Sequence, residues 1–297
     1  MDIVDAHHHL WNLEVNYYPW LTNHITPRIC GDYAAIRKDY LLADYIRDIG
    51  DYRVVKSVHV QAEHDPRDPV RETAWLQAVA DDASANPRGF PNAIVAYADL
   101  AAPNAATVLE GHCRHRNTRG IRQSLNGIIN DPPHHRDLLK DDIWRRNIAL
   151  LAAFNLSYDL QLFPVQMREA AAVVRQYESV QFLICHTGLP VDRTPEGMSL
   201  WRRGMRLLAE LPNTAVKISG LGMFDRNWTT ESIRPLVLEA IDIFGPQRSM
   251  FASNFPVDGM MATYGRVWSS FEEITRGFPE GERRALFHDN AVASYRL

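Results

Sequence analysis

The sequence predicts an α/β protein built as one (β/α)8 TIM barrel, and three observations support this fold class. First, eight short apolar segments alternate with eight longer amphipathic segments along the 297 residues. Second, strands that each lead into a helix form a parallel sheet, and eight such units typically fill about 250 residues when they close into a barrel. Third, no linker or low-complexity segment divides the chain, so we expect a single domain over residues 1–297. A doubly wound open sheet is the structural alternative.

The expected strands are short apolar runs, as a sheet covered by helices requires. They cover residues 2–7, 54–61, 93–100, 119–125, 156–162, 180–186, 214–220 and 249–254. The expected helices lie between them, at residues 41–50, 69–84, 105–116, 145–154, 165–178, 199–211, 231–245 and 264–278. Pro69 and Pro164 lie near helix starts, where a missing N–H is harmless, and Gly50 and Gly245 follow helices, where a left-handed residue is favoured.

One connection is unusually long. The segment from about residue 12 to residue 39 is rich in Tyr, Trp and Pro, and connections of this length are often functional. We expect it to lie over the barrel mouth. Trp11, Tyr17, Tyr18 and Trp20 could stack on a sugar-like ring there, although packing of the loop itself is the more frequent role of such residues.

The composition is that of an ordinary globular protein, with 46% hydrophobic residues, 23% charged residues and a formal net charge of −4. This balance does not point to nucleic acid or to an anionic membrane as a partner. Cys30, Cys113 and Cys185 are too sparse for a disulfide framework, and each is expected to be a small buried residue. The apolar runs are shorter than a membrane helix and no signal peptide is visible, so a cytoplasmic protein is expected.

The first strand carries three consecutive histidines in the stretch MDIVDAHHHLW. Alternate side chains of a strand share a face, so we expect Asp5, His7 and His9 to point one way and His8 to lie on the outer face. Two imidazoles at positions i and i+2, aimed into a barrel mouth, can bind one metal ion. Hydrogen-bonded core histidines explain this motif alone equally well. His186 ends the sixth strand in CHTGLP, at the same end of the barrel, and this favours a functional site.

DAHHHLW, CHTGLP and FASNFPVDG, in this order and spacing, resemble the amidohydrolase superfamily. GIRQSLN, DLQL and VKISGL strengthen the resemblance, which is greatest to the amidohydrolase-related branch that contains sugar-acid lactonases and 2-pyrone-4,6-dicarboxylate lactonase. The resemblance implies a (β/α)8 barrel that hydrolyses esters, lactones or amides. It also implies that His7, His9 and His186 are catalytic residues and ligands of a divalent metal ion.

One position departs from the family pattern. The strand-eight aspartate, which in this family handles the proton of the attacking water, falls at Asn254. An amide does not accept a proton near neutral pH and does not compensate the charge of a cation. Asp258 is a candidate replacement base, Glu63 could also supply the missing carboxylate, and a metal-bound hydroxide needs no separate base. We therefore expect a weak or optional metal site, with zinc as the favoured ion.

Polar residues at other strand ends indicate what the site binds. Arg122 and Lys217 could hold an anionic group or stabilise an oxyanion. Asp159, Gln161 and Glu63 could bind hydroxyl groups, although a loop salt bridge is the more frequent role for Glu63. The structural alternatives are an ion pair for Arg122 and an outer-face position for Lys217. If Lys217 is functional, Lys217→Ala should reduce turnover by orders of magnitude and leave the melting curve nearly unchanged.

Several remaining residues are given structural or weaker roles. His112 and His115 fall on an expected helix and are interpreted as surface residues. His134 and His135 lie in the loop NDPPHHRD, where a solvated position is expected. Arg226, like Arg28 in the long connection, is a loop cation that could meet an anionic substrate.

Three functions are open from the sequence. The favoured one is hydrolysis of a small anionic or hydroxylated lactone, so that the partner is a small-molecule substrate. Nonoxidative decarboxylation of an aromatic or unsaturated acid is the alternative within catalysis. A non-catalytic binding protein on a degenerate hydrolase barrel is the alternative outside it. The sequence is also compatible with a homo-oligomer.

Overall fold

The computed structural model describes residues 1–26, 28–126 and 136–297 of the chain. Eight parallel strands pair in chain order, from β1 to β8. Their bounds are β1 Ile3–His8, β2 Val54–Val60, β3 Ala93–Ala96, β4 Thr118–Ile121, β5 Ser157–Leu160, β6 Phe182–Ile184, β7 Thr214–Ile218 and β8 Ser249–Phe251. A parallel bridge between His8 and Phe255 joins the two ends of the sheet, and the His9 N–H donates to the Phe255 carbonyl at 2.7 Å. The predicted barrel is therefore confirmed, and the open-sheet alternative is wrong.

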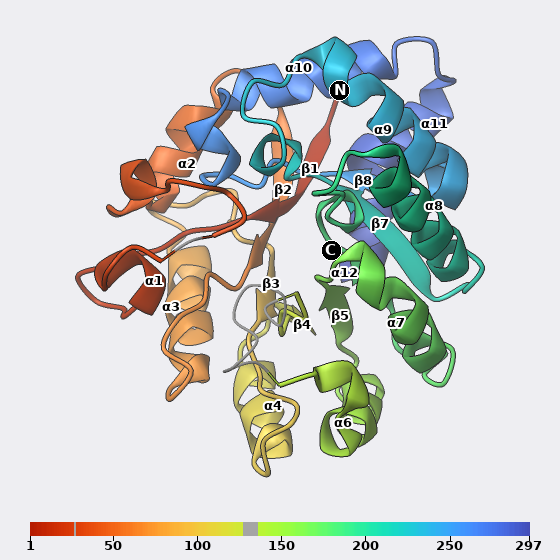
Figure 1. Ribbon diagram of the computed structural model, residues 1–297. Helices are drawn as coiled ribbons and strands as arrows, with labels where there is room; N and C mark the ends of the chain where they lie inside the picture. The colour runs from red at the N-terminus through yellow and green to blue at the C-terminus, as the bar shows by residue number, and fades with distance from the viewer. Residues whose placement is uncertain (27, 127–135) are drawn as a thin grey trace.

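The helices form a ring outside the strands (Figure 1). Those at the expected places are α2 Leu42–Ile49, α3 Pro69–Asp81, α4 Ala105–Cys113, α6 Asp142–Ala153, α7 Met167–Val174, α8 Pro195–Ala209, α9 Thr230–Phe244 and α10 Tyr264–Ile274. Helix α3 begins at Pro69, and Gly50 and Gly245 follow α2 and α9 at φ values of 56° and 75°. The proline acts as predicted. The two glycines take a positive φ that favours glycine, but their ψ values of −128° and 156° lie outside the left-handed cap that was expected.

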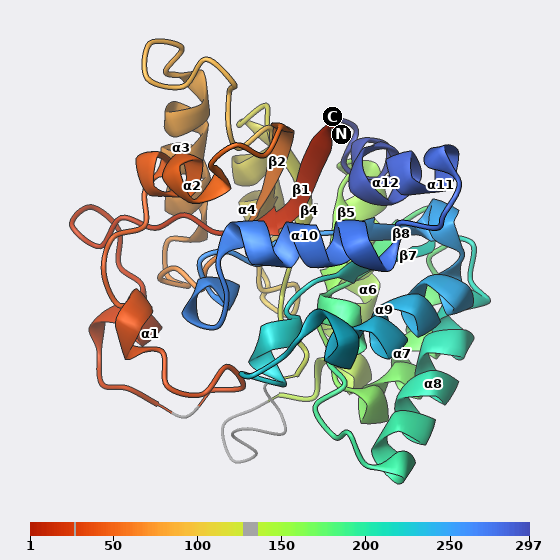
Figure 2. The ribbon, with the colours of Figure 1, turned by 90° about the horizontal axis from the view of Figure 1, so that it is seen from above.

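The sequence pattern did not indicate the short helices. Helix α1 covers Pro19–Thr22 within the long connection. At the end of the chain, α11 Glu280–Arg284 leads through a π-helical turn, Ala285–Asp289, into α12 Asn290–Tyr295. Figure 2 shows both termini at one end of the barrel and the segment that contains α1 extending toward the other end. The C-terminal helix therefore lies at the end of the barrel away from the mouth.

The apolar side chains form two separate clusters. The larger one lies between the strands and the surrounding helices. The smaller one gathers inward residues of the strands, among them Val4, Val58, Val95 and Leu183, and includes Tyr295 of α12. The barrel interior is thus filled by side chains, as in other closed barrels of eight strands, and the C-terminal helix contributes to that filling.

A β-bulge in the first strand changes which residues share a face. Between Asp5 and His8, three steps along β1 match two steps along β2. Asp5 accepts a hydrogen bond from the hydroxyl of Tyr45 on helix α2 at 2.8 Å, so it lies on the outer face. The expectation that Asp5 shares the inward face of His7 and His9 is wrong, because simple alternation fails across a bulge. His8 stacks on Tyr45, with 4.1 Å between ring centroids, and lies on the outer face as expected.

His112 is buried and is not the surface residue that the sequence suggested. It lies on α4, where Nδ1 contacts the Thr73 hydroxyl at 2.9 Å and Nε2 donates to the Tyr97 carbonyl at 2.8 Å. A carbonyl only accepts, so the nitrogen facing Tyr97 carries the hydrogen. The contact links α4 to α3 and to the end of β3, and a pattern of apolar residues alone does not reveal such a polar packing position.

Two further expectations concern exposure. Cys30 and Cys185 are buried as expected, whereas Cys113 is exposed. His134 and His135 lie outside the described residues. Within the described ranges, no helix is long and apolar enough to cross a membrane.

Glu72 of α3 is a buried carboxyl group that links this helix to the end of β2. It accepts a hydrogen bond from the Ala62 N–H at 3.0 Å, and burial raises its pKa from 4.5 to about 7. Between these two pH values the native state keeps a proton that the unfolded chain releases. The contribution of Glu72 to the free energy of unfolding therefore falls as the pH rises through this window, and it is constant above about pH 7.

Glu72→Gln should remove this decline, because the amide does not titrate. Urea unfolding at about pH 5 and about pH 8 measures the effect. The variant should gain stability relative to the wild type on going to the higher pH. A stability difference between variant and wild type that is the same at both pH values would show that Glu72 is ionised in the native state throughout.

Candidate functional site

Three histidines converge at the barrel mouth, where the strands end. His7 and His9 lie at the end of β1, and His186 opens the 3-10 turn His186–Gly188 after β6. The ring centroid of His7 is 5.0 Å from that of His9 and 4.5 Å from that of His186. His9 and His186 line a cavity of about 690 Å³, whereas His7 lies behind them and is fully buried. The structure thus brings the three predicted histidines together, with two of them open to the cavity.

Hydrogen bonds at the far ring nitrogens orient the two cavity-lining imidazoles. His9 Nδ1 lies 2.7 Å from the Val60 carbonyl, which can only accept, so Nδ1 carries the hydrogen and Nε2 presents a lone pair. His186 Nδ1 lies 3.1 Å from the Ser219 hydroxyl. Burial lowers the pKa of both histidines well below the ordinary value, and the nearby Arg122 guanidinium lowers it further. Both imidazoles are therefore neutral at neutral pH.

His7 is held between two cations. Lys217 Nζ lies 3.0 Å from its Nδ1, and Arg122 Nη1 lies 3.4 Å from its Nε2. Burial lowers the pKa of His7 well below its ordinary value, and the charge of Lys217 contributes next. An ammonium and a guanidinium can both only donate, and a neutral imidazole has one lone pair. We assign this lone pair to Nδ1, which has the shorter contact, so that Nε2 carries the hydrogen and its contact with Arg122 is not a hydrogen bond.

Lys217 of β7 points into the barrel and not outward between helices. Its ammonium forms an ion pair with Asp159 of β5, and both side chains are fully buried. Neither residue lines the cavity. Lys217 therefore acts on His7 rather than directly on a substrate, and the expected hydroxyl-binding role of Asp159 is wrong, because its carboxylate is occupied below the cavity floor.

Arg122 forms part of the cavity floor. It directly follows β4, and its guanidinium donates to the Gln61 carbonyl and to the Gln161 side-chain oxygen, the latter at 2.9 Å. Arg122 is 5% exposed, and Gln161 lines the same cavity. Two strand-end residues thus fix the plane of a buried guanidinium, so that it is held in place before any ligand arrives.

Asn254 lies on the cavity wall, and Asp258 lies behind it. The Asn254 amide nitrogen donates to Asp258 Oδ1 at 3.0 Å, which directs the amide oxygen away from Asp258. Burial raises the pKa of Asp258 to about 7, although hydrogen bonds from Asn254 and from the backbone of Gly220 and Gly222 oppose the shift. Because Asp258 does not line the cavity, it reaches the site only through Asn254.

The backbone at the rim is strained where the site residues lie. His186, Thr187 and Asn254 have φ values of 52°, 55° and 55°. This left-handed region is unfavourable for histidine and threonine and is tolerated by asparagine. Tertiary contacts hold the strained turn, among them the bond from the Trp201 indole N–H to the Thr187 carbonyl at 2.8 Å. Such strain gathers at functional sites, because the surrounding structure must over-determine it.

The long connection contributes one wall of the cavity. Pro19, Trp20, Thr26, Arg28, Ile29 and Cys30 line it, together with residues that follow β2, β3 and β4. Glu63 also lines it and forms an ion pair with Arg28 at 2.8 Å. Arg28 in turn covers the Trp20 ring, 4.7 Å from its centroid.

Of the other aromatic residues expected near the mouth, Trp11 and Tyr18 are buried packing residues, and Tyr17 is exposed. Arg226 donates to the Cys30 carbonyl at 2.7 Å and so holds this segment.

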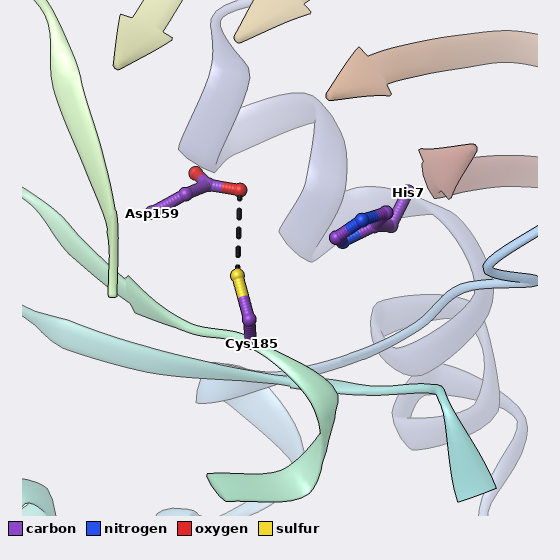
Figure 3. A group of neighbouring side chains, drawn as sticks. All are labelled: His7, Asp159 and Cys185. Carbon is purple, nitrogen blue, oxygen red and sulfur yellow. Dashed lines mark hydrogen bonds between the residues drawn. The ribbon is translucent and has the colours of Figure 1, made fainter. Parts of the chain in front are cut away.

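Within the described residues, one group of histidine, cysteine and carboxylate atoms is close enough to hold a metal ion. It consists of His7, Asp159 and Cys185, whose ligand atoms lie within 4.8 Å of one another (Figure 3). Lys217 contacts both His7 and Asp159, and burial raises the pKa of the Cys185 thiol to about 11. A cation does not fit this group, because the Lys217 ammonium already contacts two of its three members and the third, the Cys185 thiol, is protonated. The predicted set of His7, His9 and His186 does not meet the same distance limit.

Two cavity-lining nitrogens fit a metal ion better. His9 lines the cavity with the lone pair of its Nε2 free, and His186 lines the same cavity with its Nδ1 in contact with the Ser219 hydroxyl. Imidazole nitrogen is a common zinc ligand. However, among the described residues no carboxylate completes a metal-binding group of three with these two imidazoles, and the Arg122 cation lies nearby. The donor set therefore fits a weakly held ion with two imidazole ligands.

Comparisons with known proteins bear on this site. A model of the family described as Amidohydrolase matches residues 4–297. Protein y4mH of Sinorhizobium fredii is 47% identical over 302 residues, which cover 99% of this chain and 98% of that protein. The L-fucono-1,5-lactonase of Burkholderia multivorans is 29% identical, over 99% of this chain and 96% of that protein. A crystal structure of an amidohydrolase from Burkholderia multivorans with bound zinc covers 100% of both chains, with a TM-score of 0.82 and 28% identity.

The closed barrel, its histidine-lined cavity and the similarity to lactonases together define a (β/α)8-barrel enzyme of the hydrolase type. The chain belongs to the amidohydrolase family, because the family model matches all but its first three residues. The resemblance inferred from DAHHHLW, CHTGLP and FASNFPVDG is therefore confirmed.

The buried ion pair changes what a Lys217 variant should do. Lys217→Met leaves the Asp159 carboxylate buried without its cation, and the loss of one member of a buried ion pair typically costs about 3–5 kcal/mol. We expect the free energy of unfolding to fall by about that amount. The sequence-based expectation of a nearly unchanged melting curve is thus replaced, because the lysine also has a structural role.

The double variant Lys217→Met, Asp159→Asn is the matched control. It removes both charges and should regain most of the lost stability, while turnover stays low because His7 has lost its cationic neighbour. Urea unfolding followed by circular dichroism compares the two proteins. Equal unfolding midpoints for the single and double variants would contradict a stabilising ion pair.

Proposed function

We propose that this chain is a lactonase that opens a small hydroxylated lactone by adding water to its carbonyl carbon. The observation that carries the proposal is the convergence, on one cavity, of a neutral imidazole with a free lone pair and a fixed guanidinium. His9 Nε2 supplies the proton acceptor, and Arg122 supplies donors beside it. The lactonase name of the Burkholderia multivorans relative supports the same reaction.

The chemistry needs only groups that line the cavity. His9 Nε2 takes a proton from water as the oxygen attacks the lactone carbonyl, and Arg122 stabilises the oxyanion that forms. The ring C–O bond then breaks, and the imidazolium of His9 returns its proton to the leaving oxygen. The product is a hydroxy acid, which releases one proton when it ionises. Asn254 presents an amide oxygen that can accept a hydrogen bond from the attacking water.

The polar lining favours hydroxyl groups over extra carboxylates on the substrate. Among the described residues, seven side chains with an amide or an aliphatic hydroxyl line the cavity: Thr26, Gln61, Gln123, Ser124, Asn126, Gln161 and Asn254. Of the described cations in the wall, Arg28 pairs with Glu63 and Arg136 pairs with Asp141. Neutral amides and hydroxyls pair well with sugar hydroxyls, so a sugar-acid lactone such as L-fucono-1,5-lactone is the first substrate to test.

A pH-indicator assay on a panel of sugar-acid 1,4- and 1,5-lactones tests the function, with 2-pyrone-4,6-dicarboxylate as the anionic comparison. Arg122→Gln should lower kcat/KM by about 100- to 1000-fold, the typical cost of one oxyanion donor. Arg28→Gln is the matched control, because it removes a cavity-wall cation that is already paired with Glu63, and it should change kcat/KM by less than about fivefold. Release of carbon dioxide from hydroxybenzoates, without lactone opening, would instead identify a decarboxylase. No reaction with either the lactones or the hydroxybenzoates would favour a non-catalytic binding protein.

We further propose that a divalent ion, with zinc favoured, binds weakly and is not required. His9 and His186 would hold it. While the ion is bound, His9 Nε2 would not be free to take a proton, and the ion would instead polarise the substrate carbonyl. Protein purified without a histidine tag should contain less than about one zinc per chain, and dialysis against a chelator should remove it. Hydrolysis should then retain at least about half its rate. Stoichiometric zinc that survives dialysis, or loss of activity that zinc alone restores, would contradict an optional metal.

A further inference from the structure

The last helix of the chain reaches the centre of the barrel. Helix α12 ends at Tyr295, whose side chain is fully buried among inward residues of the strands. Arg296 follows in a left-handed conformation and donates to the carbonyls of Arg119 and Asn155, at 2.8 and 2.7 Å. These bonds tie the chain end to β4 and to the start of β5, so the position of Tyr295 is determined by the barrel itself.

The Tyr295 hydroxyl contacts the carboxylate of the buried ion pair. It lies 3.1 Å from each oxygen of Asp159. Lys217 Nζ, which pairs with Asp159, also lies 5.8 Å from the centroid of the Tyr295 ring. Because Lys217 contacts His7 Nδ1 at 3.0 Å, a continuous line of contacts runs from Tyr295 through Asp159 and Lys217 to His7.

Each link in this line has a defined direction. Burial raises the pKa of Tyr295 well above its ordinary value, so the phenol stays protonated and donates. Asp159 accepts from Tyr295 and from Lys217, and it also receives a weak contact from the Cys185 thiol at 3.8 Å. Lys217 donates to Asp159 and to His7. Since no link is open to solvent, a change at one end is not compensated by water.

We propose that Tyr295 is a positioning residue of the active site, which orients Asp159 and thereby places the Lys217 ammonium on Nδ1 of His7. The role goes beyond packing. Phenylalanine would fill the same space, but the Asp159 carboxylate would lose the hydrogen bond that the Tyr295 hydroxyl donates. Through this line the C-terminal helix determines which nitrogen of His7 carries the hydrogen. The catalytic consequence rests on the proposed lactonase function, whereas the effect on His7 does not.

Tyr295→Phe separates the hydroxyl from the ring. In protein labelled with 15N-histidine, the ring nitrogens of His7, assigned from the His7→Gln variant, should report a single neutral form with Nδ1 unprotonated. In Tyr295→Phe they should shift toward a mixture of the two neutral forms. On the best lactone, kcat should fall about tenfold, as for loss of a hydrogen bond to a charged group, with KM within about twofold.

Tyr177→Phe is the matched control, since it also removes a single hydroxyl that donates to a carbonyl, that of Arg145 at 2.6 Å, remote from the cavity. It should leave the His7 signals and kcat unchanged. Asp159→Asn provides a second test of the same line and should shift the His7 signals further than Tyr295→Phe. Unchanged His7 signals in Tyr295→Phe would overturn the proposal, whatever Asp159→Asn shows.

The outcomes also separate this proposal from the proposed function. Wild-type protein that opens no lactone, while Tyr295→Phe still shifts the His7 signals, would reject the lactonase and support the positioning role. Lactone opening that Tyr295→Phe leaves unchanged, together with unshifted His7 signals, would support the lactonase and reject the positioning role.

Discussion

The site depends on one buried ion pair, between Lys217 of β7 and Asp159 of β5. Both side chains are fully buried, and the removal of two charges from water is costly unless their attraction and further hydrogen bonds offset it. Here Tyr295 supplies a donor to the carboxylate, and His7 supplies an acceptor to the ammonium. The ion pair is therefore both the polar centre of the barrel interior and the support that orients a histidine at its mouth.

The rim of the barrel departs from regular strand geometry where the histidines lie. A bulge in β1 turns Asp5 outward while His7 stays inward. His186 and Asn254 take left-handed backbone conformations at the ends of β6 and β8. Each departure costs conformational free energy, and the packed barrel beneath offsets it. In return, side chains from strands remote in the sequence meet around one cavity and hold their orientation without a ligand.

Much of this arrangement could be predicted from local patterns. The strand and helix order followed from apolar periodicity, and the family followed from three short motifs. Arg122, Gln161 and the histidines at strand ends were placed correctly, because parallel strands deliver their carboxyl ends to one edge. The inward position of Lys217 was foreseen, but its ion pair was not, and so its effect on stability was misjudged. Tyr295 had no signal at all, since a tyrosine near a chain end is ordinary in sequence.

By itself the sequence determined the fold class, the end of the barrel that carries the site and the residue types available there, because periodicity and motif spacing are local properties of the chain. Only the tertiary structure decided which ring nitrogen of His9 faces the cavity, that Asp258 lies behind Asn254, and that Tyr295 supports Asp159. These features are contacts between residues far apart in the chain, and their geometry depends on a closed barrel that brings those residues within hydrogen-bonding distance.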